Sequence, residues 1–242
     1  MCFDISSTKI KQLIEINQTA EFYHDFDYKP FFHKNGFSHP NVAIIKMDEP
    51  KTIYPSIWGY IPDWGMDDIP HFRKKYNTLN AKSETLLLSP TYKRGALKTR
   101  CLIIADGFFE PHRSNGISIP YYCYIPTNRY EDGRDVFVFA GIYSELEEGV
   151  YSCSIITTKA NDFFSEIHNV KKRMPLVLNN DLKNEWLLVG LNDGQIKELL
   201  EEGYTKQVFK AHAISRNLYK RSVDTNVKEI LNPVEYNDLF DQ

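Results

Sequence analysis

Short apolar runs separated by turn residues recur along most of the chain. These runs are rich in Val, Ile, Phe and Tyr, which favour β-strands. The segments 114–116 ("SNG") and 131–134 ("EDGR") suit tight turns, so we expect hairpins there. The expected strands are 42–47, 52–60, 101–111 with an interruption at "ADG", 119–125, 135–144, 152–158 and 206–215.

Helical periodicity is confined to shorter segments between these strands. Ser7 or Thr8 is expected to cap a first helix, whose apolar stripe includes Ile10, Leu13 and Ile14. Segments 21–40 and 59–70 look irregular, the second because Pro and Gly interrupt it. Further helices are expected at 83–88, 92–98, 162–167, 181–189 and 195–202.

The order of these elements predicts the fold class. Strands follow one another in hairpins, and helices are inserted between them, which favours an α+β fold. We expect a single domain over residues 1–242, with a mainly antiparallel, barrel-like β core decorated by helices. A chain of 242 residues with 42% hydrophobic and 25% charged residues is ordinary for a globular protein.

Composition narrows the class of protein further. The N-terminus has no signal segment and no apolar run is long enough to span a membrane, so a cytoplasmic protein without membrane contact is expected. The chain has four cysteines, Cys2, Cys101, Cys123 and Cys153, and their spacing is not that of metal ligands. We therefore expect no metal site, and in a cytoplasmic protein we expect no disulfide framework. A net charge of −3 argues against bulk nucleic-acid binding but allows a local basic groove.

Cys2 is the first candidate for chemistry. Removal of Met1 would make it the first residue and give it an amine and a thiol on adjacent carbons. These groups have reference pKa values of roughly 7.7–8.0 and 8.5, so both reactive forms are accessible near neutral pH. Such an aminothiol traps an aldehyde, first as an imine and then as a five-membered thiazolidine ring. The ordinary alternative is a small packed thiol.

Three more polar positions stand out from the packing pattern. Glu110 ends an apolar strand, where it is either a solvated rim residue or a general acid–base group. His168 follows a short predicted helix, as a surface histidine or a proton shuttle. Asn80 lies in "NAKSET", which could equally be the start of a helix.

Read together, these stretches resemble the SOS response-associated peptidase family of abasic-site processing proteins. The resemblance runs from Cys2 to about Ser215, and the segment 227–234 ("VKEILNPV") also fits it. It rests on Met-Cys at the start followed in order by "WGYIPDW", "LNAKSET", "CLIIADGFFEP", "IHNVKKRMPLVL" and "HAISR".

The resemblance implies a function and a role for each of the four residues. The mature N-terminal Cys2 would crosslink to the aldehyde of an abasic site in single-stranded DNA, and would be linked to autocatalytic removal of Met1. Glu110 would move protons during imine formation, and His168 would assist opening of the sugar ring. Asn80 would hold the N-terminal amine and the sugar. No cofactor is implied, and we expect a monomer that associates with the nucleoid when bound to DNA.

The resemblance also implies a DNA-binding surface. Trp64 would stack on bases, Lys82 and Arg173 would contact phosphates, and Pro40 and Thr158 would line the groove. Lys171 and Lys172 would add positive charge beside Arg173.

The chain departs from the family pattern in three places. Phe3 and Asp4 replace the usual Gly-Arg, so that a negative charge stands where a positive one is usual. The link from His168 to Arg173 is longer than usual, and Gly65 stands where some members have a second Trp.

Two other functions remain open from the residues alone. Cys, His and Asn also serve papain-like enzymes, which leaves a cysteine peptidase acting on other proteins. A non-catalytic module that binds single-stranded nucleic acid is the other alternative, and its binding would ignore the lesion and depend on salt.

Overall fold

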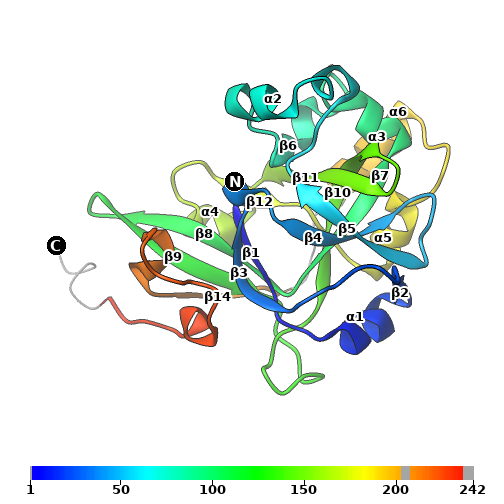
Figure 1. The fold of residues 1–242 in the computed structure, drawn as a ribbon. Helices are drawn as coiled ribbons and strands as arrows, with labels where there is room; N and C mark the ends of the chain where they lie inside the picture. Colours follow the sequence, from blue (N-terminus) through cyan, green and yellow to red (C-terminus); the bar gives the residue numbers. More distant parts are fainter. Residues whose placement is uncertain (1, 203–207, 237–242) are drawn as a thin grey trace.

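Two β-sheets form the framework of the chain in the computed structural model, which describes residues 2–202 and 208–236 (Figure 1). The larger sheet follows the order β12-β11-β10-β7-β4-β5-β2, and β6 and β13 pair with β11 and β10 at its margins. Its strands are β2 (Glu21–Phe22), β4 (Asn41–Lys46), β5 (Thr52–Trp58), β6 (Asn80–Lys82), β7 (Arg100–Ala105), β10 (Phe137–Glu147), β11 (Val150–Lys159), β12 (Arg173–Pro175) and β13 (Val177–Leu178).

The larger sheet closes on itself. Antiparallel pairs join β11 to β10, β10 to β7, β7 to β4 and β4 to β5. A parallel pairing then returns from β5 to β11, where Ser56 lies opposite Tyr151. Five strands therefore surround a common interior, which confirms the predicted mainly antiparallel, barrel-like α+β fold.

The smaller sheet holds the N-terminal strand in its interior. It contains β1 (Asp4–Ser7), β3 (Phe31–Asn35), β8 (Gly107–Ser114), β9 (Ile117–Tyr124) and β14 (Lys210–Ala213), in the order β14-β9-β8-β1-β3. Asp4 lies opposite Asn35 on one side and opposite Phe109 on the other. The start of the chain is thus fixed between two strands rather than left at an edge.

Short helices cover the outside of this framework. Figure 1 shows α2 beside β6 at one end of the molecule and α4 beside β8. The α-helices of the described residues are α1 (Lys11–Gln18), α2 (Ile69–Lys75), α3 (Lys93–Lys98), α4 (Asp162–Ile167), α5 (Asn180–Trp186) and α6 (Asp193–Glu202).

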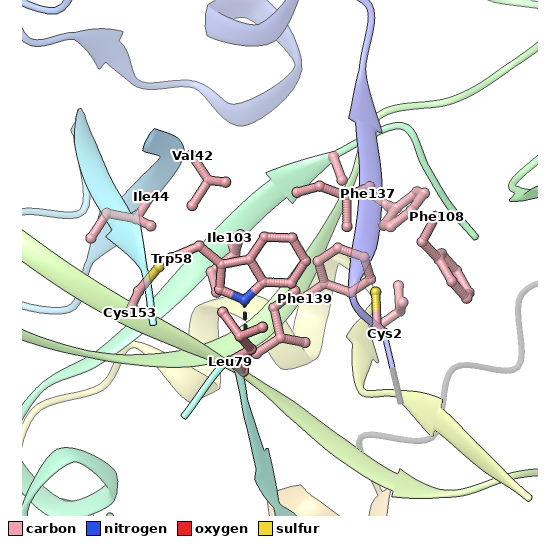
Figure 2. Packing of buried hydrophobic residues seen from close by; sticks show 14 of the residues in the cluster. Cys2, Val42, Ile44, Trp58, Leu79, Ile103, Phe108, Phe137, Phe139 and Cys153 are labelled. Atoms are coloured by element: carbon pink, nitrogen blue, oxygen red, sulfur yellow. Dashed lines mark hydrogen bonds between the residues drawn. The ribbon is translucent and has the colours of Figure 1, made fainter. Parts of the chain in front are cut away.

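An aromatic core connects the barrel to the N-terminus. Figure 2 shows Trp58 at its centre, and its indole nitrogen donates a hydrogen bond of 2.9 Å to the carbonyl oxygen of Leu79. Cys2 belongs to the same buried cluster, beside Phe108 and Phe139. Leu79 directly precedes Asn80, so this packing also positions a predicted site residue.

Several local expectations were wrong. Neither Ser7 nor Thr8 caps α1, because Ser7 lies in β1 and Thr8 donates hydrogen bonds from its backbone nitrogen and its hydroxyl to the Asp106 carboxylate. The supposed loop 59–70 contains the start of α2, whose first turn is capped by Asp68 accepting from the backbone nitrogen of His71 at 2.9 Å. Segment 21–40 includes β3, and the helix expected at 83–88 is a single 3-10 turn. Residues 206–207 of the last expected strand lie outside the described part of the chain.

Candidate functional site

Cys2 lies just before β1, fully buried in the aromatic core. Its Sγ atom is 3.8 Å from the carbonyl oxygen of Asp4. Burial raises the pKa of the Cys2 thiol well above its ordinary value, and the charge of Glu110 raises it further. The thiol is therefore held in its protonated form at neutral pH, and Glu110 lies within electrostatic reach of it.

Asn80 reaches Cys2 from the other sheet. It begins β6, and parallel pairing places it opposite Ile155 of β11. Its side-chain nitrogen donates a hydrogen bond of 2.8 Å to the backbone carbonyl of Cys2. Its Oδ1 atom is buried and has no hydrogen-bond partner among the residues that the structure describes. One acceptor beside the N-terminus is therefore available.

Glu110 and His168 form a buried pair. The Nδ1 atom of His168 is 3.1 Å from the Oε2 atom of Glu110, and the two side chains are 4% and 0% exposed. The same nitrogen is 3.1 Å from the carbonyl oxygen of Arg173. A carboxylate and an imidazole in contact, away from bulk water, can pass a proton between them.

The turn after α4 holds His168 in this position. His168 is the C-terminal cap of α4, and its backbone nitrogen donates to the carbonyl of Phe164 at 2.8 Å. The next residue, Asn169, accepts from the backbone nitrogen of Arg113 at 2.9 Å and donates to its carbonyl at 2.8 Å. These two bonds attach the turn to β8, the strand that carries Glu110.

The residues predicted to contact DNA fall into two groups. Lys82, Thr158 and Arg173 lie on β6, β11 and β12, which are adjacent strands. Lys82 is exposed and Thr158 is half-buried. The Arg173 guanidinium already contacts Glu84 at 2.5 Å and the carbonyl of Thr157 at 2.7 Å.

The second group lies outside these three strands, in the turn before β12 and in two other segments. Lys171 and Lys172 are exposed in the turn that precedes β12, and Lys172 has a positive φ of 47°. Trp64 is 51% exposed, and its ring packs edge-on against Phe72 of α2 at 5.1 Å. Pro40 is half-buried just before β4.

Between residues 2–202 and 208–236, no group of three or more His, Cys, Asp or Glu side chains is arranged to hold a metal ion. In the same residues, no helix is both long enough and apolar enough to cross a membrane.

Comparison with known proteins connects this geometry to a family. The model of the family described as SOS response associated peptidase matches residues 1–221. The chain belongs to this family. The resemblance that the sequence motifs indicated is therefore confirmed.

Three curated proteins are similar to this chain over most of its length. Abasic site processing protein YoqW from Bacillus subtilis is 32% identical over 162 residues, which are 65% of this chain and 67% of that protein. Abasic site processing protein YoaM from the same organism is 32% identical over 174 residues, 67% of this chain and 71% of that protein. Abasic site processing protein HMCES from Gallus gallus is 27% identical over 244 residues, 90% of this chain and 70% of that protein.

Solved structures show the same fold. A crystal structure of a protein from Bacteroides thetaiotaomicron has a TM-score of 0.74 and 26% identity, and it covers 97% of this chain and 100% of its own. A crystal structure of a Bordetella bronchiseptica protein has a TM-score of 0.70 at 22% identity, over 88% of this chain and 100% of its own, and supports the fold alone.

In this SOS response associated peptidase, the unusual Asp4 is part of the framework. Its Oδ1 atom accepts hydrogen bonds from Asn35 at 2.6 Å and contacts Nε2 of His33 at 2.8 Å. The other ring nitrogen of His33 is 2.7 Å from the hydroxyl of Thr225. The Asp4 carboxylate therefore connects β1 to β3, and through His33 it is connected to Thr225 in the C-terminal segment.

Sequence reasoning missed the partners of two residues in this family member. Glu84 was considered only as part of a helix start, although it pairs with Arg173 across 89 positions. His33, in a segment thought irregular, was not singled out at all. Neither pairing has a signal in the spacing of residues, because Glu84 lies in a 3-10 turn far along the chain from β12, and His33 and Asp4 lie in different strands.

Proposed function

We propose that this chain processes abasic sites in single-stranded DNA by forming a covalent link through Cys2 after Met1 is removed. The observation that carries the proposal is the convergence on Cys2 of Asn80 and of the Glu110–His168 pair. The names of the relatives support the choice of substrate, since they are abasic site processing proteins. In this proposal residues 1–242 act as one domain and as a monomer.

The proposed reaction joins an aldehyde to the N-terminal aminothiol. The amine of Cys2 attacks the aldehyde carbon of the opened abasic sugar, and loss of water leaves an imine. The Sγ atom then bonds to the imine carbon, while the thiol proton passes to the nitrogen. The products are a thiazolidine ring and one water molecule, so no oxidant or reductant is required.

The raised thiol pKa favours this order of steps. Because burial keeps the Cys2 thiol protonated, the neutral amine is the better first nucleophile at neutral pH. Glu110 lies close enough to affect the thiol electrostatically, so it is suited to accept the thiol proton when Sγ attacks. The neighbouring imidazole of His168 suits transfer of a proton to the ring oxygen of the sugar.

Asn80 is the proposed positioning residue. Its donated bond to the Cys2 carbonyl fixes the direction in which the N-terminus points. Its unpartnered Oδ1 atom suits an acceptor for the amine that cleavage after Met1 creates.

Removal of Met1 by the protein itself is part of the proposal. Sγ of Cys2 would attack the Met1 carbonyl carbon while its proton passes by way of Glu110 to the leaving amine, so that the Met1–Cys2 peptide bond breaks and a thioester forms. Water then hydrolyses the thioester, which releases methionine and restores the thiol.

Binding of the strand is assigned to the basic and aromatic residues around the site. Lys82, Lys171 and Lys172 are exposed cations suited to phosphates. Trp64 offers half of its surface for stacking, with Pro40 and Thr158 as the groove lining. Arg173 contributes to phosphate binding only where the DNA competes with Glu84.

The experiment that tests the proposal combines two measurements. Intact mass establishes whether the purified chain begins at Cys2. Incubation with an oligonucleotide that carries one abasic site is then expected to give a heat-stable shifted band with wild type and none with Cys2→Ala. Cys101→Ala, which changes another fully buried thiol, is the matched control and keeps the band. An equal band from Cys2→Ala refutes the proposal.

The two alternative functions have less support. A papain-like peptidase needs a thiolate with a lowered pKa, whereas burial raises the pKa of Cys2 and His168 contacts Glu110. A purely electrostatic binding module would bind intact and abasic strands equally and would tolerate Cys2→Ser. The same oligonucleotides, with and without the lesion, distinguish it.

A further inference from the structure

A hollow of about 460 Å³ lies beside the N-terminal strand. One side is formed by β1 and β3 together with Phe37, and the other by the segment 218–225. None of the site residues derived from the sequence lines it. Its walls and its floor differ in chemistry.

The polar side chains on the floor of the hollow are already hydrogen-bonded to one another. Asp4, His33 and Thr225 are connected by contacts of 2.8 and 2.7 Å, and Asn35 donates to the same Asp4 oxygen at 2.6 Å. The His33 and Asp4 side chains are only 6% and 18% exposed. This floor therefore serves as a preformed support rather than as the group that binds a ligand.

The walls present two exposed aromatic rings. Phe37 is 58% exposed and Tyr219 is 45% exposed. Rings that remain this accessible beside a hollow are suited to stacking on a planar group, and nucleobases stack on such rings whatever their sequence. The Tyr219 hydroxyl is 3.4 Å from that of Ser118, which holds the ring against β9.

The rim carries two cations. Lys220 and Arg221 are exposed, and their side chains have no ion-pair or hydrogen-bond partner within the described ranges 2–202 and 208–236. Arginine presents a planar fork of donors that matches a phosphate, and lysine adds a point charge. Exposed rings and free cations that line one hollow match the two parts of a nucleotide.

One wall of the hollow is connected to Cys2, and the other is within electrostatic reach of Glu110. Phe3 directly follows Cys2, and its ring centroid is 4.9 Å from that of Phe37. On the opposite wall, burial raises the pKa of the Tyr219 hydroxyl, the Ser118 hydrogen bond lowers it, and the charges of Asp4 and Glu110 raise it further. The hollow is thus within electrostatic reach of the proposed proton-transfer group.

We propose that this hollow binds the nucleotide adjoining the abasic site, with its base stacked on Phe37 and Tyr219 and its phosphate held by Lys220 and Arg221. The inference rests on the proposed function and adds a subsite that positions the strand. It also gives Phe3 a role, since Phe3 supports Phe37. A single nucleotide suits the small volume and the free cations better than a protein partner, which needs a much larger contact area.

The test uses oligonucleotides that differ only in their flanks. One carries an abasic site with three nucleotides on each side, and two others lack the flank on either the 5′ or the 3′ side. We expect wild type to crosslink one truncated strand about tenfold more slowly, because losing one stacked base costs about that factor. Phe37→Ala and Arg221→Ala should slow reaction with the full strand and leave that truncated strand unchanged.

Two controls make the result decisive. Lys93→Ala removes an exposed cation from α3 and should behave as wild type with all three strands. Thermal melting confirms that the variants fold. If neither truncation slows wild type, or if Phe37→Ala slows full and truncated strands equally, the subsite does not exist.

Failure of the subsite is separable from failure of the crosslink. A strand bearing a tetrahydrofuran in place of the abasic sugar has no aldehyde, so fluorescence anisotropy measures its binding alone. Arg221→Ala should weaken binding of this strand about tenfold and reduce its salt dependence, whether or not Cys2 reacts. Equal binding by wild type and Arg221→Ala overturns the inference. A missing Cys2-dependent band overturns only the crosslink.

Discussion

The side-chain amide of Asn80 is bonded to the backbone carbonyl of Cys2 across 2.8 Å, joining positions that are 78 residues apart. Both residues are buried, so water does not compete for this bond. Asn80 lies in the barrel sheet and Cys2 leads into the smaller sheet. The direction in which the N-terminus points therefore depends on how the two sheets pack against each other.

Removing the amide should impair crosslinking more than stability. Asn80→Ala deletes one buried hydrogen bond, worth about 1 kcal/mol of unfolding free energy. The loss of orientation at the N-terminus should reduce the crosslinking rate by about tenfold or more. Urea unfolding and single-turnover crosslinking check the two effects. Asn128→Ala, which changes an exposed asparagine in the loop between β9 and β10, should leave both unchanged.

The buried thiols should make stability depend on alkaline pH. Burial raises the pKa of Cys2, Cys101, Cys123 and Cys153, the last to about 12. Each folded-state pKa lies above its unfolded value, so the native chain retains protons that the unfolded chain releases. The contribution is fully present below about pH 8.5 and is lost as pH rises toward the folded pKa, by up to about 1.4 kcal/mol per pH unit and thiol.

Urea unfolding between pH 7 and pH 10 checks this slope. Wild type should lose stability more steeply above pH 8.5 than Cys153→Ala, because that variant has one titrating thiol fewer. A slope that is identical in the two proteins would contradict the argument.

Native Cys2 should also react slowly with iodoacetamide at pH 8, and quickly once urea unfolds the chain.

Asp4 should matter for stability rather than for DNA repulsion. Asp4→Ala leaves the donors of His33 and Asn35 without their shared acceptor, which costs about 1–3 kcal/mol. Asp4→Asn keeps an acceptor oxygen and should lose less. Asp4→Arg, which restores the charge usual in the family, should be at least as unstable as Asp4→Ala. A more stable Asp4→Arg protein would refute this reading of the contacts.

Glu84 should restrain Arg173 in the absence of DNA. Burial alone would raise the pKa of Glu84, but the hydrogen bond from Arg173, a backbone hydrogen bond and the charges of Arg173 and Lys159 together outweigh it and lower the pKa. The pair therefore stays ionised at neutral pH and is lost as pH falls below about 4.5, through the lowered pKa of Glu84.

Glu84→Gln should release the guanidinium for a phosphate. We expect tighter binding of single-stranded DNA and an increase of about 0.7 in the salt slope, since one more phosphate contact forms. Anisotropy titrations at several salt concentrations measure both. Glu166→Gln, an exposed carboxylate on α4, is the charge-matched control. Unchanged binding by Glu84→Gln would exclude Arg173 as a phosphate contact.

Local patterns predicted much of the framework. The helix at Asp162–Ile167 and the hairpin after Ser114 lie where the sequence indicated them, because capping and turn residues act over a few positions. Thr8 failed as a helix cap because the distant Asp106 binds it instead. Rules for helix caps consider only neighbouring residues, so they do not anticipate a hydrogen-bond partner that is distant along the chain.

In the candidate site, too, some features could be predicted from the sequence and others could not. The family motifs pointed to Asn80, Glu110 and His168, and the structure brings these residues together around Cys2. The pairing of Arg173 with Glu84 and the position of Asp4 on His33 had no local signal. Both depend on strand register, which the sequence alone does not specify.

The position of β1 has a consequence for the timing of assembly. The strand lies between β3 and β8, and Ser6 reaches a partner 100 residues away in Asp106. Pairings this distant form late in folding, because the intervening loop must close first. Cys2 therefore meets Asn80, Glu110 and His168 only after synthesis has passed the middle of the chain. A nascent chain carries the thiol but lacks these partners, so the proposed crosslinking is postponed until the residues through His168 have been made.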